Sequence, residues 1–464
     1  MSTETRLEKD SIGTKEVPGD AYYGIQTARA LENFPVSGLK AHPNMIRAYA
    51  MIKKACALAN RDLKTLDPER AKLIVEACDE ILGGGLQDQF VVDVFQAGAG
   101  TSFNMNMNEV ICNRALEKAG KQKGEGSYLH PNDHVNMAQS TNDTFPTAAH
   151  LAALFQIQAL LPALADLQTA LGQKAEEFAG TIKSARTHLQ DAVPITLGQE
   201  FKAYQSTIGL AAEELKKSGD NLLGVALSGT AAGTGTNTKP GFRKLVLKHL
   251  SRISGLKLRP PADPRSALQS HWPLATVSGA LKELAIELIR ISNDLRLLAS
   301  GPTTGLAEII LPAVQPGSSI MPGKVNPSMA ECLNMVAFQI VGLDCANSLA
   351  AQAGQLDLNV MTPLVAHNLT CATQYLINFL PVFTRKCVAG IKADREKCNE
   401  YFGKSLSLAA LLNPKIGYAK AAEVFKEALA RKTTVSRVVL EKKLLTEAEL
   451  EKLFHPKTVA GEPS

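Results

Sequence analysis

The sequence predicts a mainly all-α protein of several domains, organised around a bundle of long helices. At 464 residues, the chain exceeds the size at which a single hydrophobic core keeps growing. Hydrophobic residues make up 45% of the chain but aromatic residues only 5%, and Ala and Leu are abundant. This composition favours packed helices over sheets, because strands are enriched in β-branched and aromatic residues.

Three domains are predicted, with boundaries after residues 139 and 390. Residues 1–139 form a mixed, mostly helical domain, because short helical patterns alternate with joints such as Gly83-Gly84-Gly85. Residues 140–390 form a central bundle of five helices, since long apolar-periodic runs follow one another with few helix breakers. The runs lie at 147–174, 197–227, 274–298, 330–350 and 360–383. Residues 391–464 form a small C-terminal helical domain, in which Thr446-Glu447-Ala448-Glu449 resembles a capping box.

Several of the long runs are apolar around much of the helix circumference, as at residues 151–161. Such a helix needs cover on more than one side, which a single bundle does not easily give to several helices at once. We therefore predict that the chain forms oligomers.

Charge and motif content exclude several kinds of partner. The net charge is +5, from 50 Lys and Arg against 45 Asp and Glu, and no basic run with interleaved aromatics stands out, so nucleic acid is not expected. The polar N-terminus, and the absence of a later run judged long and uncharged enough for a bilayer, predict no membrane partner. The eight scattered cysteines indicate reduced thiols and a cytoplasmic protein. No metal-ligand spacing and no nucleotide-binding glycine motif is found, so neither a metal nor a cofactor is predicted.

Polar loops between the helices are the candidate functional segments. Four of them, at residues 98–108, 139–144, 186–191 and 317–327, are unusually rich in Ser, Thr, Asn and Gly. A fifth, at 228–238, fits a plain flexible connection equally well. Taken alone, residues 101–104 and 140–143 are well explained as helix caps.

The loop at 317–327 carries the strongest signal. It reads Gly-Ser-Ser-Ile-Met-Pro-Gly-Lys-Val-Asn-Pro and gathers a hydroxyl pair (Ser318 and Ser319), an ammonium (Lys324) and an amide (Asn326) between two glycines. Glycines permit close backbone approaches, so this combination suits gripping a small anion. With the other loops, it predicts a metal-free site for a carboxylate-rich substrate.

This loop resembles the signature loop of the aspartase/fumarase superfamily, homotetrameric lyases that release fumarate from succinyl compounds. Four further segments, at 100–106, 130–136, 186–191 and 354–360, support the resemblance. It implies a three-domain lyase whose five-helix bundles form a twenty-helix core in a homotetramer. It also implies composite active sites, each assembled from three subunits.

Within the superfamily, the runs Gly-Thr-Ser-Phe-Asn-Met-Asn at 100–106 and Ser-Thr-Asn-Asp at 140–143 resemble aspartases more than class II fumarases. The resemblance implies reversible deamination of L-aspartate to fumarate and ammonia, by abstraction of a Cβ proton through an aci-carboxylate intermediate. A class II fumarase is an alternative, because that group shares the Thr-His-Leu-Gln motif around His188. So is a lyase acting on an N-substituted aspartate, since Thr303, Thr362 and Asp357 depart from the usual pattern. A catalytically silent scaffold would be expected to lack Ser318 or its anion-binding partners, which are present.

The resemblance also implies roles for individual residues. Ser318 would be the base, but a serine hydroxyl is a poor base unless loop N–H groups and Lys324 lower its pKa. Lys324 and Asn326 would hold the developing negative charge, and His188 and Asn142 would face the leaving amino group. Ser319 has a supporting role, and Glu331 would orient His188, although a carboxylate is favoured in the first turn of a helix in any case. The remaining expected carboxylate donors are Thr101, Ser140, Thr141 and Thr187.

The other histidines carry less weight. His130 and His134 are expected to make local hydrogen bonds or a secondary anion contact. The remaining six are expected to be structural: His42, His150, His249, His271, His367 and His455.

Overall fold

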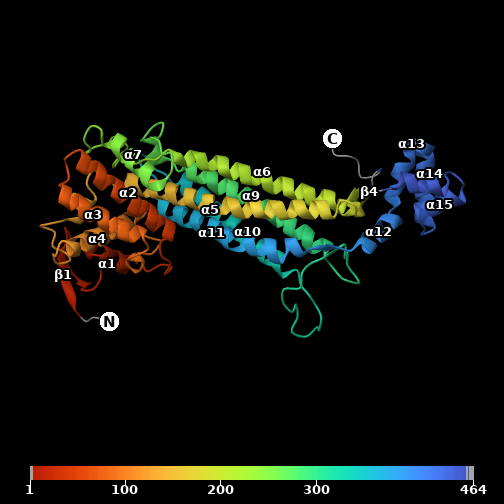
Figure 1. Ribbon diagram of the computed structural model, residues 1–464, viewed down its shortest axis with the longest axis horizontal. Helices are drawn as coiled ribbons and strands as arrows, with labels where there is room; N and C mark the ends of the chain where they lie inside the picture. The colour runs from red at the N-terminus through yellow and green to blue at the C-terminus, as the bar shows by residue number, and fades with distance from the viewer. Residues whose placement is uncertain (1–3, 456–457, 459–464) are drawn as a thin grey trace. The chain divides into compact units, whose positions relative to one another are not determined.

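The computed structural model describes residues 4–455 and residue 458. It confirms the prediction of a mainly helical protein (Figure 1). Within these residues, the strands form three two-stranded antiparallel sheets, β1–β2, β3–β4 and β5–β6. The strands are β1 (Thr5–Lys9), β2 (Thr14–Pro18), β3 (Ile182–Thr187), β4 (Gln190–Thr196), β5 (Ile309–Ile310) and β6 (Lys392–Ala393). The helices are α1 (Ile25–Asn33), α2 (Pro43–Asp62), α3 (Pro68–Leu82), α4 (Thr101–Lys118), α5 (Thr141–Glu177), α6 (Leu197–Asp220), α7 (Phe242–Ser254), α8 (Ser266–Gln269), α9 (Trp272–Leu298), α10 (Ser328–Gln352), α11 (Thr362–Lys386), α12 (Arg395–Lys404), α13 (Asn413–Ile416), α14 (Tyr418–Ala430), α15 (Val435–Glu441) and α16 (Glu447–Leu453).

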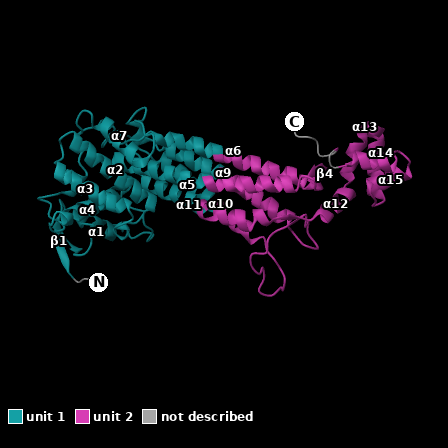
Figure 2. Cartoon of the chain, viewed as in Figure 1, with its two compact units in different colours: residues 1–161, 213–283, 339–375 teal, residues 162–212, 284–338, 376–464 magenta. Residues whose placement is uncertain are grey.

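The chain forms two compact units, each built from three separate segments (Figure 2). Unit 1 comprises residues 1–161, 213–283 and 339–375, and unit 2 comprises residues 162–212, 284–338 and 376–464. The five long helices α5, α6, α9, α10 and α11 each contribute residues to both units. The three-domain division at 139 and 390 stays a prediction, and residues 456–457 and 459–464 of its last domain lie outside the described residues.

Side-chain caps explain where several helices begin. Asp67 accepts hydrogen bonds from the N–H groups of Glu69 and Arg70 at the start of α3, and the capping box predicted at Thr446 and Glu449 is present at α16. The first bundle helix, α5, begins at Thr141, six residues earlier than the apolar pattern begins at 147. The polar residues ahead of that pattern thus form its first turns.

One bundle helix is shorter than its apolar pattern. The run at 197–227 predicts a single helix, but α6 ends at Asp220 and a 3₁₀ turn follows at Asn221–Leu223. Gly224 then adopts an extended conformation, and the N–H of Val225 donates to the carbonyl of Arg259. Residues 225–227 are buried outside any helix, so their apolar character resembles that of a buried helix turn.

An aromatic cluster in unit 1 holds α2, α4 and α5 together. Tyr49 lies edge-on to Phe103 and Phe145, with ring centroids 5.3 and 5.9 Å away, and the two phenylalanine rings are 6.4 Å apart. Phe103 and Phe145 lie in the first turns of α4 and α5. The cluster therefore brings the N-termini of these helices together.

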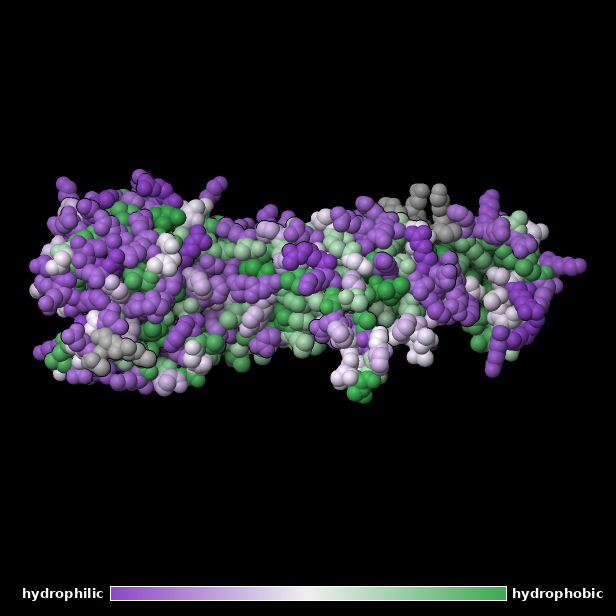
Figure 3. All heavy atoms as spheres, turned by 60° about the horizontal axis from the view of Figure 1, so that its bottom comes forward, coloured by the Kyte–Doolittle hydropathy of each residue, from purple (hydrophilic) through white to green (hydrophobic). Residues whose placement is uncertain are grey.

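Two helices correct the expectation that no apolar run is long enough for a bilayer. By length and composition alone, α5 and α10 both qualify. The most apolar window of α5 is 72% buried, as in a core helix, whereas that of α10 is only 33% buried. Met335, Phe338 and Leu349 on α10 are more than half exposed, and Figure 3 shows apolar surface among the polar side chains of the long helices.

Candidate active site

The structure distributes the predicted site residues over three places. The first is the pair of helix N-termini in unit 1, the second is the tip of the β3–β4 hairpin in unit 2, and the third is the loop between β5 and α10, also in unit 2. The residues at the first place are Thr101, Ser140, Thr141 and Asn142. Those at the second are Thr187 and His188, and those at the third are Ser318, Ser319, Lys324 and Asn326, with Glu331 in the first turn of α10.

At the first place, a glycine turn leads into α4 against the side of α5. Gly100 has φ +86°, and a Cβ atom there would lie 2.0 Å from the Phe145 ring, so only glycine fits. Thr101 follows it and is exposed, while Thr141 is 8% exposed. The side-chain amide of Asn104 donates to the Thr141 hydroxyl over 2.9 Å, which joins the two helices directly.

Ser140 acts as the cap that the sequence suggests, whereas the Asn142 side chain bonds to a distant loop. The Ser140 Oγ accepts from the N–H of Asn142, and the Asn142 amide donates to the carbonyl of Ala231 over 2.8 Å. Because its NH₂ group is engaged in this way, the side-chain oxygen of Asn142 is the part left to accept a ligand donor.

The Gly/Thr-rich loop at 228–238 is held down by a buried carboxylate. Asp143 accepts hydrogen bonds from the N–H groups of Ser228 and Thr230 at 3.0 and 2.9 Å. Burial raises the pKa of Asp143 to about 6, against these hydrogen bonds and the attraction of Lys53. The beginning of this loop is therefore anchored, and any binding role for it stays a prediction.

At the second place, His188 sits at the tip of a strained hairpin. Thr187 pairs with Gln190, and the two residues between them, His188 and Leu189, have φ of +57° and +59°. This left-handed pair is the geometry of a type I′ turn, which usually takes Asn-Gly. Both residues are exposed. Such strain in non-glycine residues persists only where the surroundings hold it, and it gathers at functional sites.

Four charged side chains hold the base of this hairpin. Lys183 is 1% exposed and its ammonium lies 2.7 Å from a Glu200 oxygen and 3.0 Å from a Glu308 oxygen. Arg186 donates to the same Glu308 oxygen at 2.8 Å. Glu308 immediately precedes β5, so it links the hairpin to the start of the segment that leads to Ser318. This cluster is not visible in the sequence, because Glu308 lies more than 100 residues from the three members on and after β3.

At the third place, the loop at 317–327 closes on itself. The Gly317 N–H donates to the Lys324 carbonyl at 2.8 Å, and the Asn326 amide donates to the Gly317 carbonyl at 2.7 Å. A Cβ atom on Gly317 would lie 2.6 Å from the Lys324 carbonyl oxygen, which explains the glycine. The closed loop extends from the helices (Figures 1 and 3), and Ile320 near its middle is 83% exposed.

The loop directs two backbone donors at Ser318. The N–H groups of Ile320 and Met321 donate to the Ser318 Oγ at 3.2 and 3.0 Å. Donors aimed at an oxygen stabilise its anionic form, which is what a serine base requires. This geometry agrees with the expectation that loop N–H groups face the serine oxygen.

Within the described part of one chain, no hydrogen bond joins the hairpin tip to the loop at 317–327. Glu331 lies 4.0 Å from Arg296 and makes no hydrogen bond to His188 in the same part of the chain. Its orienting role stays a prediction. Within the described part of one chain, the hairpin tip and the loop at 317–327 are therefore two separate places that do not form one site by direct hydrogen bonds.

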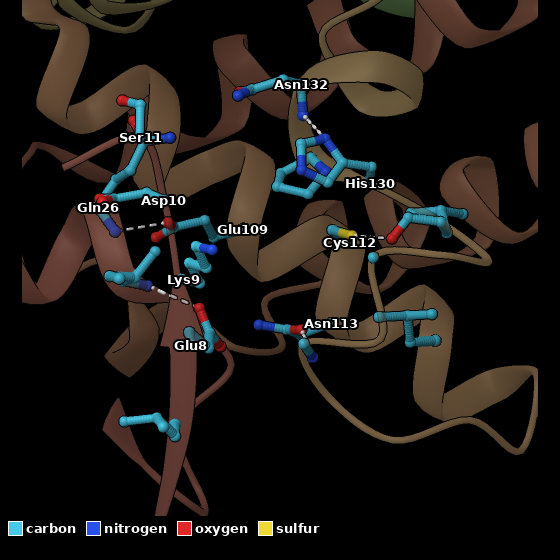
Figure 4. Close-up of a pocket in the computed structure, with 17 residues that line it drawn as sticks. Glu8, Lys9, Asp10, Ser11, Gln26, Glu109, Cys112, Asn113, His130 and Asn132 are labelled. Atoms are coloured by element: carbon cyan, nitrogen blue, oxygen red, sulfur yellow. Dashed lines mark hydrogen bonds between the residues drawn. The ribbon is translucent and has the colours of Figure 1, made fainter. Parts of the chain in front are cut away.

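A cavity of about 530 Å³ in unit 1 lies apart from these residues (Figure 4). Three carboxylates line it, and each is already engaged. Glu109 accepts from backbone N–H groups of α1, Glu8 pairs with Arg6, and Asp10 pairs with Arg29. His130 is occupied with its own turn, where its ring nitrogen accepts from the N–H of Asn132. We therefore interpret the cavity as structural.

Two family models match the chain and cover most of it. The model described as Lyase matches residues 13–342, which include every predicted site residue, and the model described as Fumarase C C-terminus matches residues 408–461. The fold and the loop therefore define a lyase. More specifically, the chain belongs to the aspartase/fumarase superfamily.

Relatives of two activities resemble the whole chain. Aspartate ammonia-lyase from Bacillus sp is 47% identical over 456 residues, 98% of this chain and 97% of the relative. Fumarate hydratase class II from Thermosynechococcus vestitus is 47% identical over 463 residues, 100% of this chain and 99% of the relative. A cobalt-bound crystal structure of fumarate lyase:delta crystallin from Brucella melitensis matches with a TM-score of 0.96 at 46% identity, covering 99% of this chain and 100% of that chain.

Proposed function

We propose that the protein is an ammonia-lyase that reversibly deaminates L-aspartate to fumarate and ammonia. The aspartate ammonia-lyases among its full-length relatives support this choice of substrate, as do the runs at 100–106 and 140–143. We further propose that it acts as a cytoplasmic homotetramer. The weakly buried apolar surface of α10 supports such an assembly.

The observation that carries the chemistry is the pair of N–H donors aimed at Ser318. They favour the deprotonated serine, which then takes the proton from Cβ of the substrate. The electron pair of the broken C–H bond moves into the adjacent carboxylate and forms the aci-carboxylate. Lys324 and Asn326 stand in the same loop, where the Lys324 ammonium and the Asn326 N–H that does not donate to Gly317 stabilise this additional negative charge.

In the second step, the C–N bond breaks. The aci-carboxylate electrons form the C=C bond of fumarate, and the amino group, protonated as an ammonium, leaves with the C–N electron pair as neutral ammonia. Asn142 and His188 hold the amino group, the former through the side-chain oxygen that Ala231 leaves free. Thr101, Ser140, Thr141 and Thr187 bind the carboxylates, and Ser319 and Glu331 support the loop and His188. The proton taken by Ser318 passes to solvent.

A substrate screen tests the proposal. Purified protein is incubated separately with L-aspartate, L-malate and N-substituted aspartates, and fumarate is followed by its ultraviolet absorbance. Fumarate from L-aspartate with stoichiometric ammonia supports the proposal. Fumarate from another of these substrates, with none from L-aspartate, contradicts it.

A class II fumarase is the second candidate. The hydratase from Thermosynechococcus vestitus matches this chain at the same 47% identity as the first ammonia-lyase, and the hairpin presents His188 in the Thr-His-Leu-Gln motif shared with that group. The L-malate arm of the screen decides between the two.

A further inference from the structure

Lys53 is a buried lysine that the proposed chemistry does not use. It lies in the middle of α2 and is 0% exposed. Its ammonium donates to three amide oxygens, those of Asn104 at 2.7 Å, Asn136 at 3.0 Å and Gln139 at 2.9 Å. Three donors thus meet three acceptors, and no carboxylate in the described residues forms an ion pair with this lysine.

The lysine fixes which way each amide points. Because an ammonium only donates, each amide turns its oxygen toward Lys53 and its NH₂ group away. The Gln139 NH₂ group donates to the carbonyls of Val135 and Met137, and the Asn104 NH₂ group donates to the Thr141 hydroxyl at 2.9 Å.

The direction of this last bond determines what Thr141 can do. Its oxygen already accepts from Asn104, and its own hydroxyl proton finds no acceptor among the described residues. Thr141 is the first residue of α5, where the helix dipole favours an anion, and it retains 8% exposure. The hydroxyl is therefore left to donate outward, as a bound carboxylate requires.

We propose that Lys53 is a positioning residue for dicarboxylate binding, which orients Asn104 so that the Thr141 hydroxyl donates to a substrate carboxylate. This inference rests on the proposed function, because it assigns Thr141 to the substrate. Burial lowers the pKa of the Lys53 ammonium to about 7, against the attraction of Asp143. Binding is therefore measured at a pH below about 7, where the ammonium form is the larger fraction.

The first test replaces the ammonium without changing the length of the side chain much. Calorimetric titration with succinate, a dicarboxylate that lacks the leaving group, compares wild type with Lys53→Met. We expect the dissociation constant to rise about tenfold, the effect of losing one well-directed hydrogen bond to a charged group. In aspartate kinetics, we expect Lys53→Met to raise KM by a larger factor than it lowers kcat. The matched control is Lys54→Met, because Lys54 pairs with Asp79 on the surface and should leave succinate binding unchanged.

A double-mutant cycle separates positioning from general damage. In a Thr141→Val background, Lys53→Met should weaken succinate binding by less than about twofold, because the hydroxyl it orients is gone. Equal losses in both backgrounds would overturn the proposal, as would unchanged binding by Lys53→Met.

If Lys53→Met does not fold, Asn104→Asp provides a second test of the same proposal. The carboxylate still accepts from Lys53 but cannot donate to Thr141, so the threonine proton turns toward it and away from the ligand. We expect weaker succinate binding, with a clearly smaller loss in the Thr141→Val background. The added negative charge is present in both backgrounds and so cancels in the comparison. Equal losses of succinate binding in the two backgrounds refute the proposal.

If wild type binds succinate but does not deaminate aspartate, the proposed function fails while this test of Lys53 still stands. If wild type deaminates aspartate but does not bind succinate, the proposal for Lys53 fails while the proposed function stands.

Discussion

At the scale of single residues, the direction of a hydrogen bond matters as much as its presence. Ser318 accepts local bonds that a turn would explain, and Asn142 donates to the distant carbonyl of Ala231. In Ser318 those bonds stabilise an anionic oxygen, and in Asn142 they leave the side-chain oxygen to accept. The hydrogen bonds that hold these two side chains in place are therefore also the ones that suit them to the proposed chemistry.

Replacing Ser318 by alanine should lower kcat for fumarate formation by at least about a thousandfold, because it removes the proposed base. Size-exclusion chromatography should show an unchanged assembly. A suitable control is Ser270→Ala, since the Ser270 hydroxyl also accepts from a turn N–H, that of Trp272, but lies outside the predicted site. Retained turnover by Ser318→Ala would assign the proton abstraction to another group.

Two buried histidines should make the fold sensitive to acid. Burial lowers the pKa of both His150 and His271 to about 4 from the usual value of 6.5. The native state then binds fewer protons than the unfolded state between these values, so stability is full above pH 6.5 and is lost as pH falls toward 4. At about pH 5 the cost is about 2 kcal/mol for each histidine.

The measurement is the drop in thermal unfolding temperature between about pH 7 and about pH 5. His271→Gln should show a smaller drop than wild type, because glutamine can still bond to the Thr362 hydroxyl but does not titrate. An equal drop in the two proteins would show that other groups cause the acid sensitivity.

At the scale of elements, the β3–β4 hairpin depends on charges from distant parts of the chain. The turn at His188 and Leu189 is strained, and the hairpin is short. Glu308 compensates by accepting from Lys183 and Arg186 on β3, while its backbone carbonyl accepts from the N–H of Asp394. The carboxylate thus positions the strand that ends at Thr187.

Glu308→Gln should lower the unfolding free energy by about 3–5 kcal/mol, because it leaves Lys183 and Arg186 partly uncompensated in a buried place. Chemical denaturation, together with kcat for aspartate, would measure the effect on fold and site. Glu400→Gln provides the contrast, since Glu400 bridges Lys397 and Lys404 on the surface and should change stability little. Similar effects of the two substitutions would argue against a supporting role for Glu308.

At the scale of the whole molecule, the exposed hairpin tip, the exposed loop and the weakly buried α10 all point to assembly. A monomer would leave Phe338 and Met335 in water, together with Ile320 on the loop. In an assembly, the exposed apolar side chains of the helices are buried against other chains, and loops from different chains can meet. This is the arrangement that a composite site requires.

Mixing two variants of low activity tests for composite sites. Thr141→Val and Ser318→Ala chains, dissociated and reassembled together, should recover part of the wild-type activity, because some hybrid sites receive an intact residue from each chain. The control mixture of Ser318→Ala with Lys324→Met should recover none, since both residues belong to one loop. If the first mixture also stays inactive while hybrids are shown to form, each site is built from a single chain.

The sequence by itself determined the helical class, the approximate positions of the long bundle helices and the identity of the loop at 317–327. Apolar periodicity is a local property, and so are glycine and proline spacing, which is why these features can be read from neighbouring residues. The same local reading extends α6 too far, because the buried apolar residues 225–227 resemble a helix turn when the pairing of Val225 with Arg259 is unknown.

Only the tertiary structure decided the hydrogen-bond directions and the buried charges. Lys53 lies in an apolar stretch of α2, which is a visible anomaly, but its three acceptors come from residues 104–139. Glu308 likewise meets Lys183 and Arg186 from more than 100 residues away. A buried ammonium or carboxylate is stable only with specific partners, and those partners become neighbours only when distant segments pack together.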